Sequence, residues 1–343
     1  MTYQNRNAHI LVGDIGGTKT SLALYVSDQI LDSAVHEATY QNAEFSTVED
    51  ILISFLDETN SRPDYACFGV AGPVSNNRVQ LTNHKWFIDG EHIRQRLGLD
   101  NVLLINDLVA TAVSAVHLPD SAFQTLNPGI PDPHGAVAVL APGTGLGEAF
   151  LIHYNKSMLP CPSEGGHGSF APVNNTQARL LRYMLKKADH VSTEMVCSGL
   201  GIPHLYDFLK TELEESPQFA SLLSESPDKT KCIVDAALSA LDNDVSDIYL
   251  PLAAMHLFVD ILASEASNLT LKVLATGGVY IGGGIPPRIR PFLAPEIFMA
   301  SFCQGGYQGM LSNIPVHIIL EPKAPLIGAA AYCMAQLNHP RER

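Results

Sequence analysis

The sequence predicts an α/β fold built from two domains. The chain has 343 residues, and at roughly 150 residues per domain this length favours two domains, each large enough to enclose a core. Residues 9–25 and 135–154 each contain two β-rich arms joined by a Gly/Thr turn. Such a pair indicates an internal repeat with one hairpin in each half of the chain. Strand-like and helix-like stretches follow each hairpin, which is typical of an α/β protein.

The elements of the first half follow from their patterns. Val48, Ile51, Leu52, Phe55 and Leu56 recur at helical spacing, and Thr47 with Asp50 provides a capping box at the start of that helix. Runs of apolar and β-branched residues predict strands. In chain order we expect two strands within 9–25, an extension over 31–40, a helix over 47–60, strands over 65–70 and 102–105, and a helix over 107–118.

The second half is predicted to be mostly helical. Residues 118–135 are rich in Pro and Gly, which suits a connection between the domains. Helical stretches are expected over 177–187, 201–214, 232–241 and 247–271. They are followed by a strand, a turn and a second strand within 273–285, a strand over 315–320, and a helix of small residues over 325–337.

Composition and charge exclude several classes of protein. The formal charge of −14, with 21 Lys+Arg against 35 Asp+Glu, offers no footprint for nucleic acid or an anionic membrane. The hydrophobic fraction of 46% excludes dominant disorder. Six scattered cysteines without a C-x-x-C pair indicate neither a disulfide scaffold nor a zinc ribbon. Because no signal peptide or run of 18 apolar residues appears, we expect a cytoplasmic protein.

Three glycine-rich turns are candidate anion sites. They are Gly16-Gly17-Thr18, Gly143-Thr144-Gly145 and the turn that contains Gly282 and Gly283. Glycine lets backbone amides approach a ligand, and consecutive amides form concave anion-binding sites. None of the three has the spacing of the nucleotide-binding P-loop or of the dinucleotide fingerprint G-x-G-x-x-G. A plain hairpin remains the alternative for each turn taken alone.

Two aspartates follow predicted strands. Asp14 lies inside GDIGGT, where a carboxylate beside phosphate-binding amides makes sense if Mg²⁺ lies between them, usually through water; the alternative is that Asp14 only caps the turn. Asp107 follows Asn106 after a buried strand. There it could accept a proton from a substrate hydroxyl, with the Asn106 amide orienting that hydroxyl. The alternative role for Asp107 is that of helix N-cap.

Polar side chains that suit a polyol occur in three further segments. Glu164 and His167 flank two glycines, and a carboxylate with an imidazole can accept from and donate to vicinal hydroxyls. Together with Cys161 they also have loose metal-ligand spacing, although three ligands of mixed type are poor evidence for a metal. Glu194 lies in a turn rich in Ser and Thr, and Asn83 lies in the polar segment around the only Trp.

Taken together, these motifs resemble one family. The stretches that carry the resemblance run in family order through nearly the whole chain: LVGDIGGTKTSLALY, FGVAGPV, LTNHKW, LLINDLVATA, LAPGTGLGEAFL, PSEGGHGSFAP, STEMVCSGLGI, GGVYIGGGIPPRI and PLIGAAAY. The chain resembles the bacterial-type ATP-dependent glucokinases, which belong to the superfamily of sugar kinases, actin and heat-shock chaperone ATPases. The resemblance implies a two-domain actin-like, ribonuclease H-like fold. A cleft would separate a small domain (1–117 plus 322–343) from a large domain (118–321).

The same resemblance implies a reaction and a role for each candidate residue. The reaction would be ATP-dependent phosphorylation of glucose to glucose 6-phosphate, the first step of glycolysis, in a homodimer. Asp107 would be the general base on the 6-hydroxyl, and Asp14 would position Mg²⁺. The other roles would be hydroxyl binding by Asn83, Asn106, Glu164, His167 and Glu194, phosphate binding by Gly16, Gly17, Thr18, Gly143, Thr144 and Gly145, and contact with adenosine by Gly282 and Gly283.

The chain departs from the family pattern at Lys19 and Thr20, where this glucokinase group usually has Asn followed by Ala. GGTKT is more typical of a related family of repressors and kinases. That family carries a cysteine-rich zinc motif and an N-terminal helix-turn-helix, neither of which is evident in this sequence. The alternatives that stay open are another hexose specificity, ADP or polyphosphate as donor, and a sugar-binding regulator without catalysis.

Overall fold

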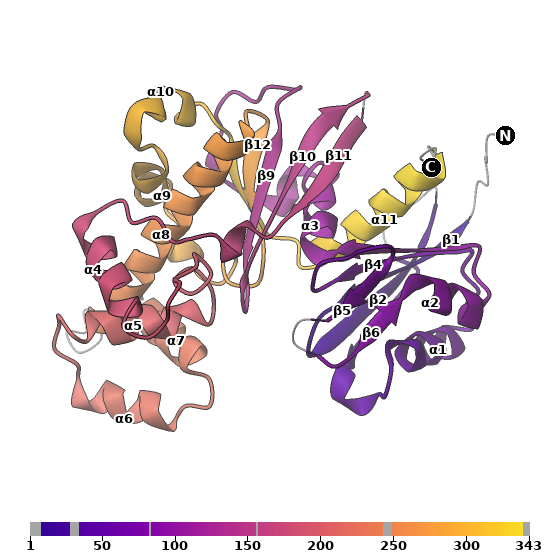
Figure 1. Cartoon of the computed structure of the whole chain (residues 1–343), viewed down its shortest axis with the longest axis horizontal. Coiled ribbons are helices and arrows are strands. Elements are labelled where there is room, and N and C mark those ends of the chain that lie inside the picture. Colours follow the sequence, from indigo (N-terminus) through magenta and orange to yellow (C-terminus); the bar gives the residue numbers. More distant parts are fainter. Residues whose placement is uncertain (1–7, 28–33, 82–83, 156, 243–248, 339–343) are drawn as a thin grey trace. The chain divides into compact units, whose positions relative to one another are not determined.

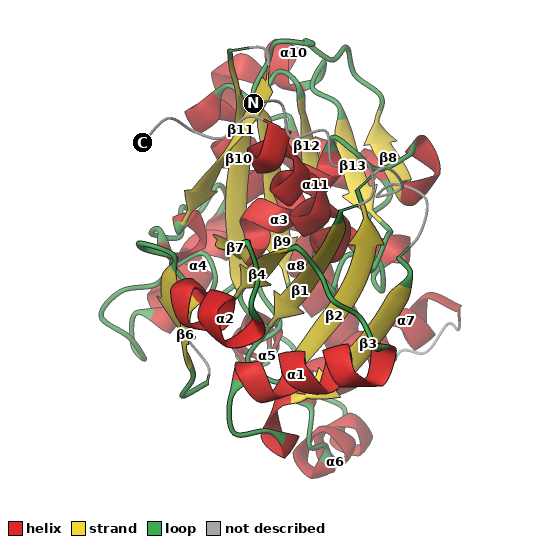
Figure 2. Cartoon of the chain, turned by 90° about the vertical axis from the view of Figure 1, so that its right-hand side faces the viewer, coloured by secondary structure: helices red, strands yellow, loops and turns green. Residues whose placement is uncertain are grey.

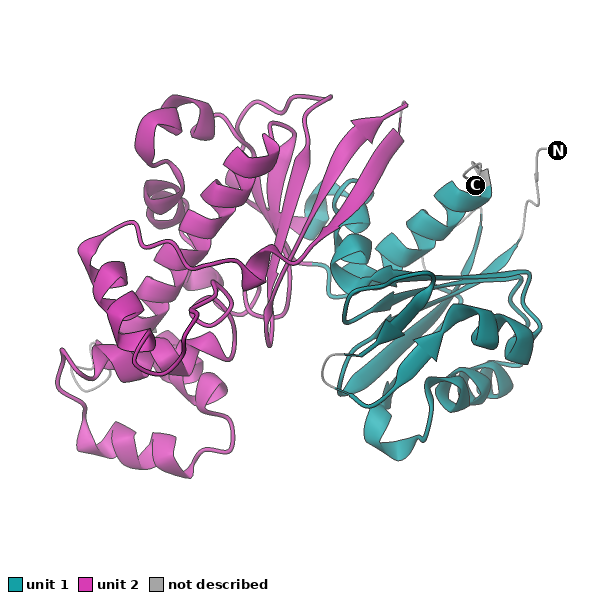
Figure 3. Ribbon diagram, in the orientation of Figure 1, with its two compact units in different colours: residues 1–122, 321–343 teal, residues 123–320 magenta. Residues whose placement is uncertain are grey.

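The computed structural model describes residues 8–27, 34–81, 84–155, 157–242 and 249–338. The chain divides into two compact units (Figure 3): unit 1 is residues 1–122 with 321–343, and unit 2 is residues 123–320. We expected the chain to pass between domains near residues 117 and 322.

Unit 1 is a five-stranded sheet with helices on both faces (Figure 1). The strand order is β3-β2-β1-β4-β7, and Figure 2 shows these strands side by side. β1 runs antiparallel to β2 and parallel to β4, which in turn is parallel to β7. The elements are β1 (His9–Ile15), β2 (Lys19–Val26), β3 (His36–Gln41), η1 (Asn42–Glu44), α1 (Val48–Thr59), β4 (Tyr65–Val70), β5 (Arg78–Gln80), β6 (Phe87–Asp89), α2 (Gly90–Leu97), β7 (Asn101–Asn106), α3 (Asp107–Ala115), η2 (Asp120–Ala122) and α11 (Ala324–Asn338).

Alternation along β1 builds two cores in unit 1. Leu11 packs in a cluster with residues of α1 and α2, whereas Ile10 and Val12 pack in a cluster with residues of α3 and α11. Successive side chains of a strand point to opposite faces, so a sheet covered on both faces buries nearly every residue of its central strands. The capping box predicted for α1 is present, with Thr47 and Asp50 exchanging hydrogen bonds.

Unit 2 contains a six-stranded sheet in the order β11-β10-β9-β12-β13-β8. Its first five strands repeat the plan of unit 1: β9 is antiparallel to β10 and parallel to β12, and β13 is parallel to β12. The two sheets therefore share one strand plan, as the repeated hairpins predict. The elements are β8 (Phe123–Asn127), β9 (Val137–Pro142), β10 (Leu146–Tyr154), β11 (Ser157–Ser163), η3 (Gly165–His167), α4 (Asn175–Met184), α5 (Gly201–Leu209), α6 (Pro217–Glu225), α7 (Lys229–Asp242), α8 (Tyr249–Val273), β12 (Gly278–Ile281), η5 (Arg290–Phe292), α9 (Pro295–Phe302), η6 (Gly305–Tyr307), α10 (Gln308–Leu311) and β13 (Val316–Ile319).

The long helix α8 forms the centre of unit 2 and packs against α5, α7 and α9. It is the one helix of the described residues that is long and apolar enough to cross a membrane, and 78% of its most apolar window is buried inside the structure. Burial of this kind is what a core helix shows, and the helix carries the charged residues Asp260 and Glu265.

Three expectations about local structure were wrong. Residues 273–275 do not form a strand, because α8 continues to Val273 and only β12 follows. The segment 118–135 is more than a connection, since it contains β8, which pairs with β13. Asp107 was considered as the N-cap of the helix that follows β7. In the structure Asn106 is the N-cap of this helix and Asp107 is its first residue.

Candidate active site

The carboxyl ends of three parallel strands bring Asp14, Asn106 and Asp107 to one edge of the sheet in unit 1. Asp14 on β1 is paired with Gly69 on β4, and the next residue of β4, Val70, is paired with Asn106 on β7. Gly69 lies between the two aspartates, and a Cβ placed on it would lie 3.5 Å from the Asp107 Cα. Ligands of open α/β sheets bind at this carboxyl edge.

Asp107 is not the residue that caps α3. The Asn106 Oδ1 accepts from the backbone N–H groups of Leu108 and Val109 at 3.0 and 3.3 Å, and its Nδ2 donates to the Gly72 carbonyl at 3.2 Å. The Asp107 carboxylate accepts from the N–H of Leu108 and stands in the first turn of the helix, where the helix dipole favours a negative charge.

Asp14 is half-buried beside the first glycine turn. Burial raises the pKa of its carboxyl, and the positive charge of Lys19 acts in the opposite direction. A carboxylate kept from water beside backbone amides favours a cationic neighbour. The turn itself, Gly16-Gly17-Thr18, joins β1 to β2, and the Gly16 N–H donates to the Lys19 carbonyl at 3.0 Å.

The second glycine turn lies in unit 2, and backbone hydrogen bonds within the turn and from Gly199 and Leu200 hold it in place. Gly143 donates its N–H to the Gly145 carbonyl at 2.9 Å, and the N–H groups of Gly199 and Leu200 donate to the carbonyls of Gly143 and Thr144 at 2.8 and 3.2 Å. Thr144 is exposed. The segment that leads into α5 therefore fixes both carbonyls of this turn.

The third glycine turn packs against the second. The Gly282 N–H donates to the Leu140 carbonyl at 2.8 Å, and Gly283 has a positive φ of 84°. A Cβ on Gly283 would lie 2.5 Å from the Pro142 carbonyl oxygen, directly before Gly143. Only glycine fits this left-handed conformation and close approach.

The structure also brings together Glu164, His167 and Glu194. His167 lies 3.9 Å from a Glu164 carboxylate oxygen and 3.8 Å from one of Glu194. These separations are within ion-pair range but too long for hydrogen bonds. The side chains of Glu164 and His167 are 62% and 60% exposed, whereas that of Glu194 is 26% exposed. Three polar groups that converge without bonding to one another leave donors and acceptors for hydroxyls of a ligand.

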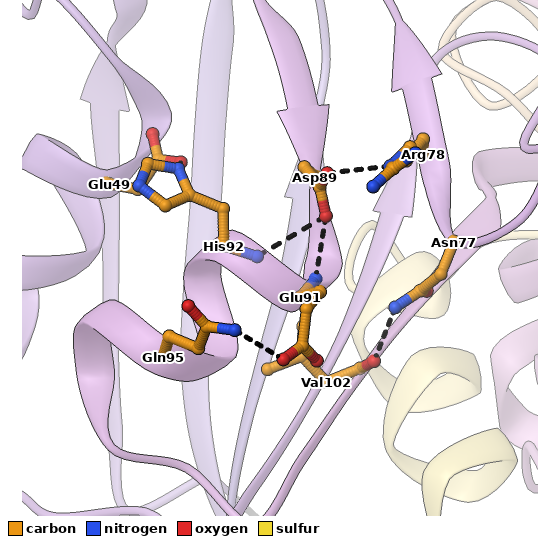
Figure 4. A network of polar contacts seen from close by, with 8 residues as sticks. All are labelled: Glu49, Asn77, Arg78, Asp89, Glu91, His92, Gln95 and Val102. Atoms are coloured by element: carbon orange, nitrogen blue, oxygen red, sulfur yellow. Dashed lines mark hydrogen bonds and ion pairs between the residues drawn. The ribbon is translucent and has the colours of Figure 1, made fainter.

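Asn83 lies outside the described residues, but the hairpin that leads to it is described. Figure 4 shows Asn77 reaching β7, where its Nδ2 donates to the Val102 carbonyl at 2.9 Å. Its Oδ1 accepts from the Leu104 N–H at 2.7 Å, so the Asn77 amide bonds the free edge of β7 as a strand would. Arg78 and Asp89, 2.7 Å apart, join β5 to β6.

The cysteines were considered above as disulfide partners and, for Cys161, as a metal ligand. All six cysteines are free thiols. Among the described residues no group of three His, Cys, Asp or Glu side chains is arranged to hold a metal, and Cys161 donates its thiol to the Leu159 carbonyl.

Comparison with known proteins identifies the family. A family model described as Glucokinase matches residues 11–336. A curated glucokinase of Nostoc punctiforme is 39% identical over 345 residues, which cover 96% of this chain and 99% of that protein. The chain belongs to the glucokinase family. Phosphorylation of glucose is the activity that this membership gives it.

Solved structures agree with the glucokinase family in fold. A crystal structure of glucokinase from an Antarctic psychrotroph matches with a TM-score of 0.79 and 32% identity, covering 95% of this chain and 99% of that one. A glucokinase of Streptomyces griseus, in complex with glucose and AMPPNP, matches with a TM-score of 0.66 at 18% identity, covering 96% and 100%. The fold is the two-domain actin-like ATPase fold.

Proposed function

We propose that the chain transfers the terminal phosphoryl group of ATP to the 6-hydroxyl of glucose, with Asp107 as general base. The observation that carries the proposal is that Asp107 starts α3 directly after β7, at the same sheet edge to which β1 brings Asp14, with Asn106 providing the helix cap. Glucokinase family membership supplies the sugar. The Streptomyces griseus neighbour that holds AMPPNP supports ATP as donor.

A single aspartate suffices for this reaction because of the character of its transition state. A carboxylate is far too weak a base to deprotonate an alcohol before the reaction begins. In the loose transition state of phosphoryl transfer the nucleophile is bonded only weakly, so the hydroxyl proton moves late. Asp107 then has two tasks: it orients the 6-hydroxyl toward the phosphorus, and it accepts the proton as the hydroxyl becomes acidic.

The other hydroxyls of glucose are assigned to Glu164, His167 and Glu194 in unit 2, with Asn106 and Asn83 in unit 1. The support for the first three is their convergence at 3.8–3.9 Å without mutual hydrogen bonds. A carboxylate accepts from two hydroxyls at once, and an imidazole can accept from one and donate to another. This set would fix the sugar so that the 6-hydroxyl reaches Asp107.

The phosphates are assigned to the glycine turns. Gly16, Gly17 and Thr18 would hold the transferred phosphoryl group, and Gly143, Thr144 and Gly145 the other end of the triphosphate. Gly282 and Gly283 would border adenosine, and the close approach of Gly283 to Pro142 supports a continuous surface with the second turn. Backbone amides in such turns bind anions without bringing a positive side chain.

Asp14 fits a magnesium ion. Mg²⁺ prefers carboxylate and water oxygens and is usually held by one or two carboxylates together with substrate phosphates. Asp14 is a half-buried carboxylate beside a phosphate turn, and a bare carboxylate at that place would repel the donor. When bound, Mg²⁺ would neutralise charge on the phosphate oxygens, while Asp14 orients its water shell.

We also carry forward three assignments from the family resemblance. They are a homodimer, a cytoplasmic location, and a division of the kinase into a small domain (1–117 plus 322–343) and a large domain (118–321). Unit 1 then contains the general base, one phosphate turn, Asn83 and Asn106, and unit 2 contains Glu164, His167, Glu194 and the other phosphate turn.

Initial rates of ADP release test the proposed function. MgATP would be supplied with glucose, mannose, fructose, galactose or N-acetylglucosamine. MgADP and polyphosphate would be tried as donors with glucose, and because neither donor releases ADP, the formation of glucose 6-phosphate is measured for them. Glucose with MgATP is expected to give the highest kcat/KM. A higher kcat/KM for another sugar would show that this sugar, and not glucose, is the preferred substrate. Glucose binding without ADP release would favour a sugar-binding regulator.

A further inference from the structure

Asn42, at the start of η1, makes four hydrogen bonds, three of them to the first glycine turn and the start of β2 and one within η1. Its backbone N–H donates to the Thr18 carbonyl at 2.9 Å, and its side-chain Nδ2 donates to the Gly16 carbonyl at 2.9 Å. Its Oδ1 accepts from the Thr20 hydroxyl at 2.8 Å, and its own carbonyl accepts from the Phe45 N–H at 3.1 Å. One residue that follows β3 thus ties two carbonyls of the turn to the strand β2.

Asn42 and Thr20 are among the most buried polar residues of the chain. Asn42 is 1% exposed and Thr20 is 0% exposed. A buried amide or hydroxyl without partners costs free energy, so these two groups stabilise the structure only while they bond to each other and to the turn.

Holding the Gly16 carbonyl fixes the direction of the next amide. In a planar trans peptide, the carbonyl of Gly16 and the N–H of Gly17 point in opposite directions. Because the carbonyl is bonded to Asn42, the Gly17 N–H points away from Asn42. Glycine permits a peptide to rotate at little cost, and a rotated Gly16–Gly17 peptide would turn a carbonyl oxygen to the side where an amide is needed. Such a turn would repel phosphate.

We propose that Asn42 and Thr20 are positioning residues that lock the Gly16–Thr18 turn with the Gly17 amide directed at the phosphate of the donor. The proposal rests on the phosphate role given above to this turn. Amides that are already oriented need no reorganisation when charge develops on the transferred group. Loss of the Thr20–Asn42 hydrogen bond would therefore weaken nucleotide binding and slow transfer, while glucose binding to the free enzyme would stay unchanged.

The test uses two substitutions of different severity and a matched control. Thr20→Val removes the hydroxyl and keeps the side-chain shape, Thr20→Ser keeps the hydroxyl, and Asn42→Ala removes the amide. The control is Thr39→Val, which removes another hydroxyl hydrogen bond of β2, the 3.0 Å contact between Ser21 and Thr39. Calorimetry measures the affinities for MgAMPPNP and glucose separately, and amide hydrogen exchange measures the opening of residues 13–20.

Thr20→Val is expected to weaken MgAMPPNP binding about fivefold to tenfold, as the loss of one buried hydrogen bond implies. It is also expected to speed exchange across the turn and to leave glucose affinity within twofold. Thr20→Ser and Thr39→Val are expected to behave as the wild type. If Thr20→Val unfolds at a lower temperature but binds MgAMPPNP normally and exchanges at the wild-type rate over 13–20, the proposal is wrong and the pair is merely structural.

Failure of the proposed function gives a different result. If the wild-type chain binds no MgAMPPNP, the donor assignment fails together with the phosphate role of Asn42 and Thr20. The exchange rates of Thr20→Val and Asn42→Ala would then still decide whether Asn42 fixes the turn. A fast-exchanging turn in a wild type that does bind MgAMPPNP would contradict the lock itself.

Discussion

The Glu194 carboxylate accepts a hydrogen bond from the Leu146 backbone N–H at 2.8 Å. Leu146 directly follows the turn Gly143-Thr144-Gly145, and the other Glu194 oxygen lies 3.8 Å from His167. One side chain therefore contacts both the turn assigned to phosphate and the group assigned to sugar hydroxyls. A displacement of the turn would therefore also displace the Glu194 carboxylate beside His167.

We predict that Gly145→Ala raises the KM for glucose at least tenfold. A Cβ on Gly145 would overlap the Glu194 carboxylate, so Glu194 would have to leave its place beside His167. Steady-state kinetics at saturating MgATP measure the effect. Gly306→Ala is the control, because a Cβ there meets nothing within 4 Å. An unchanged glucose KM in Gly145→Ala would remove Glu194 from the hydroxyl-binding set.

Glu148 predicts a dependence of stability on pH. The side chain is 1% exposed on β10, and burial, aided by the negative charge of Glu265 and opposed by Lys272, raises the pKa of its carboxyl to about 7. The folded state therefore favours the neutral carboxyl. The contribution of Glu148 to the free energy of unfolding is therefore largest below the ordinary glutamate pKa, falls by about 3 kcal/mol as the pH rises to 7, and is then level.

Urea unfolding between pH 4.5 and 8.5 checks this contribution of Glu148. Glu148→Gln is expected to abolish the fall in stability that the wild type shows up to pH 7, whereas Glu296→Gln, a change at an exposed residue, is expected to keep it. Parallel curves for the wild type and Glu148→Gln would show that folding does not raise the pKa of Glu148.

Asn106 offers a way to separate capping from sugar binding. Asn106→Ala removes the acceptor for two N–H groups at the start of α3 and is expected to lower the free energy of unfolding by about 1 kcal/mol. Asn106→Asp keeps that acceptor and should keep the cap. If Asn106 also holds a hydroxyl through its amide, Asn106→Asp raises the glucose KM at nearly unchanged stability. A normal KM in that variant would restrict Asn106 to capping.

Gly328 sets the distance between α11 and α3. A Cβ on Gly328 would overlap the Ala110 carbonyl, so the two helices touch through a position that only glycine allows. Gly328→Ala is expected to lower the free energy of unfolding by about 1–3 kcal/mol, as overpacked cores do, and to lower kcat because α3 carries Asp107 at its start. Thermal unfolding and kcat would be compared with Gly309→Ala, which places a Cβ in open space. Wild-type stability in Gly328→Ala would contradict the close contact.

Local patterns predicted the elements whose residues alternate or recur clearly. The strand over 65–70 and the capping box at Thr47 are confirmed, because each has a clear local pattern in the sequence: a short apolar run and a Thr-x-x-Asp motif. β11 was not predicted, since Pro160 and Pro162 weaken its pattern, although an edge strand tolerates proline. Residues 273–275 were mistaken for a strand because Val273, Leu274 and Ala275 form a short apolar run before a glycine turn.

For the candidate site, too, the sequence predicted what local patterns show and missed what depends on contacts between distant residues. The motifs that contain Asp14, Asn106, Asp107 and Glu164 lie at or just after the ends of strands, so the sequence could place them at a sheet edge. Asn42 and Glu148 were missed. Asn42 lies in an ordinary polar segment, and its partners Gly16 and Thr20 are more than twenty residues away along the chain. Glu148 stands in a strand where alternation alone does not say which face is buried.

The most direct test of the account is turnover by Asp107→Ala, measured together with its affinity for glucose. We predict that kcat with MgATP falls by a factor of about 10²–10⁴, as for loss of a general base, while calorimetry shows glucose bound within a few fold of the wild type. A kcat within fivefold of the wild type, at normal stability, would contradict the assignment of Asp107 as the base.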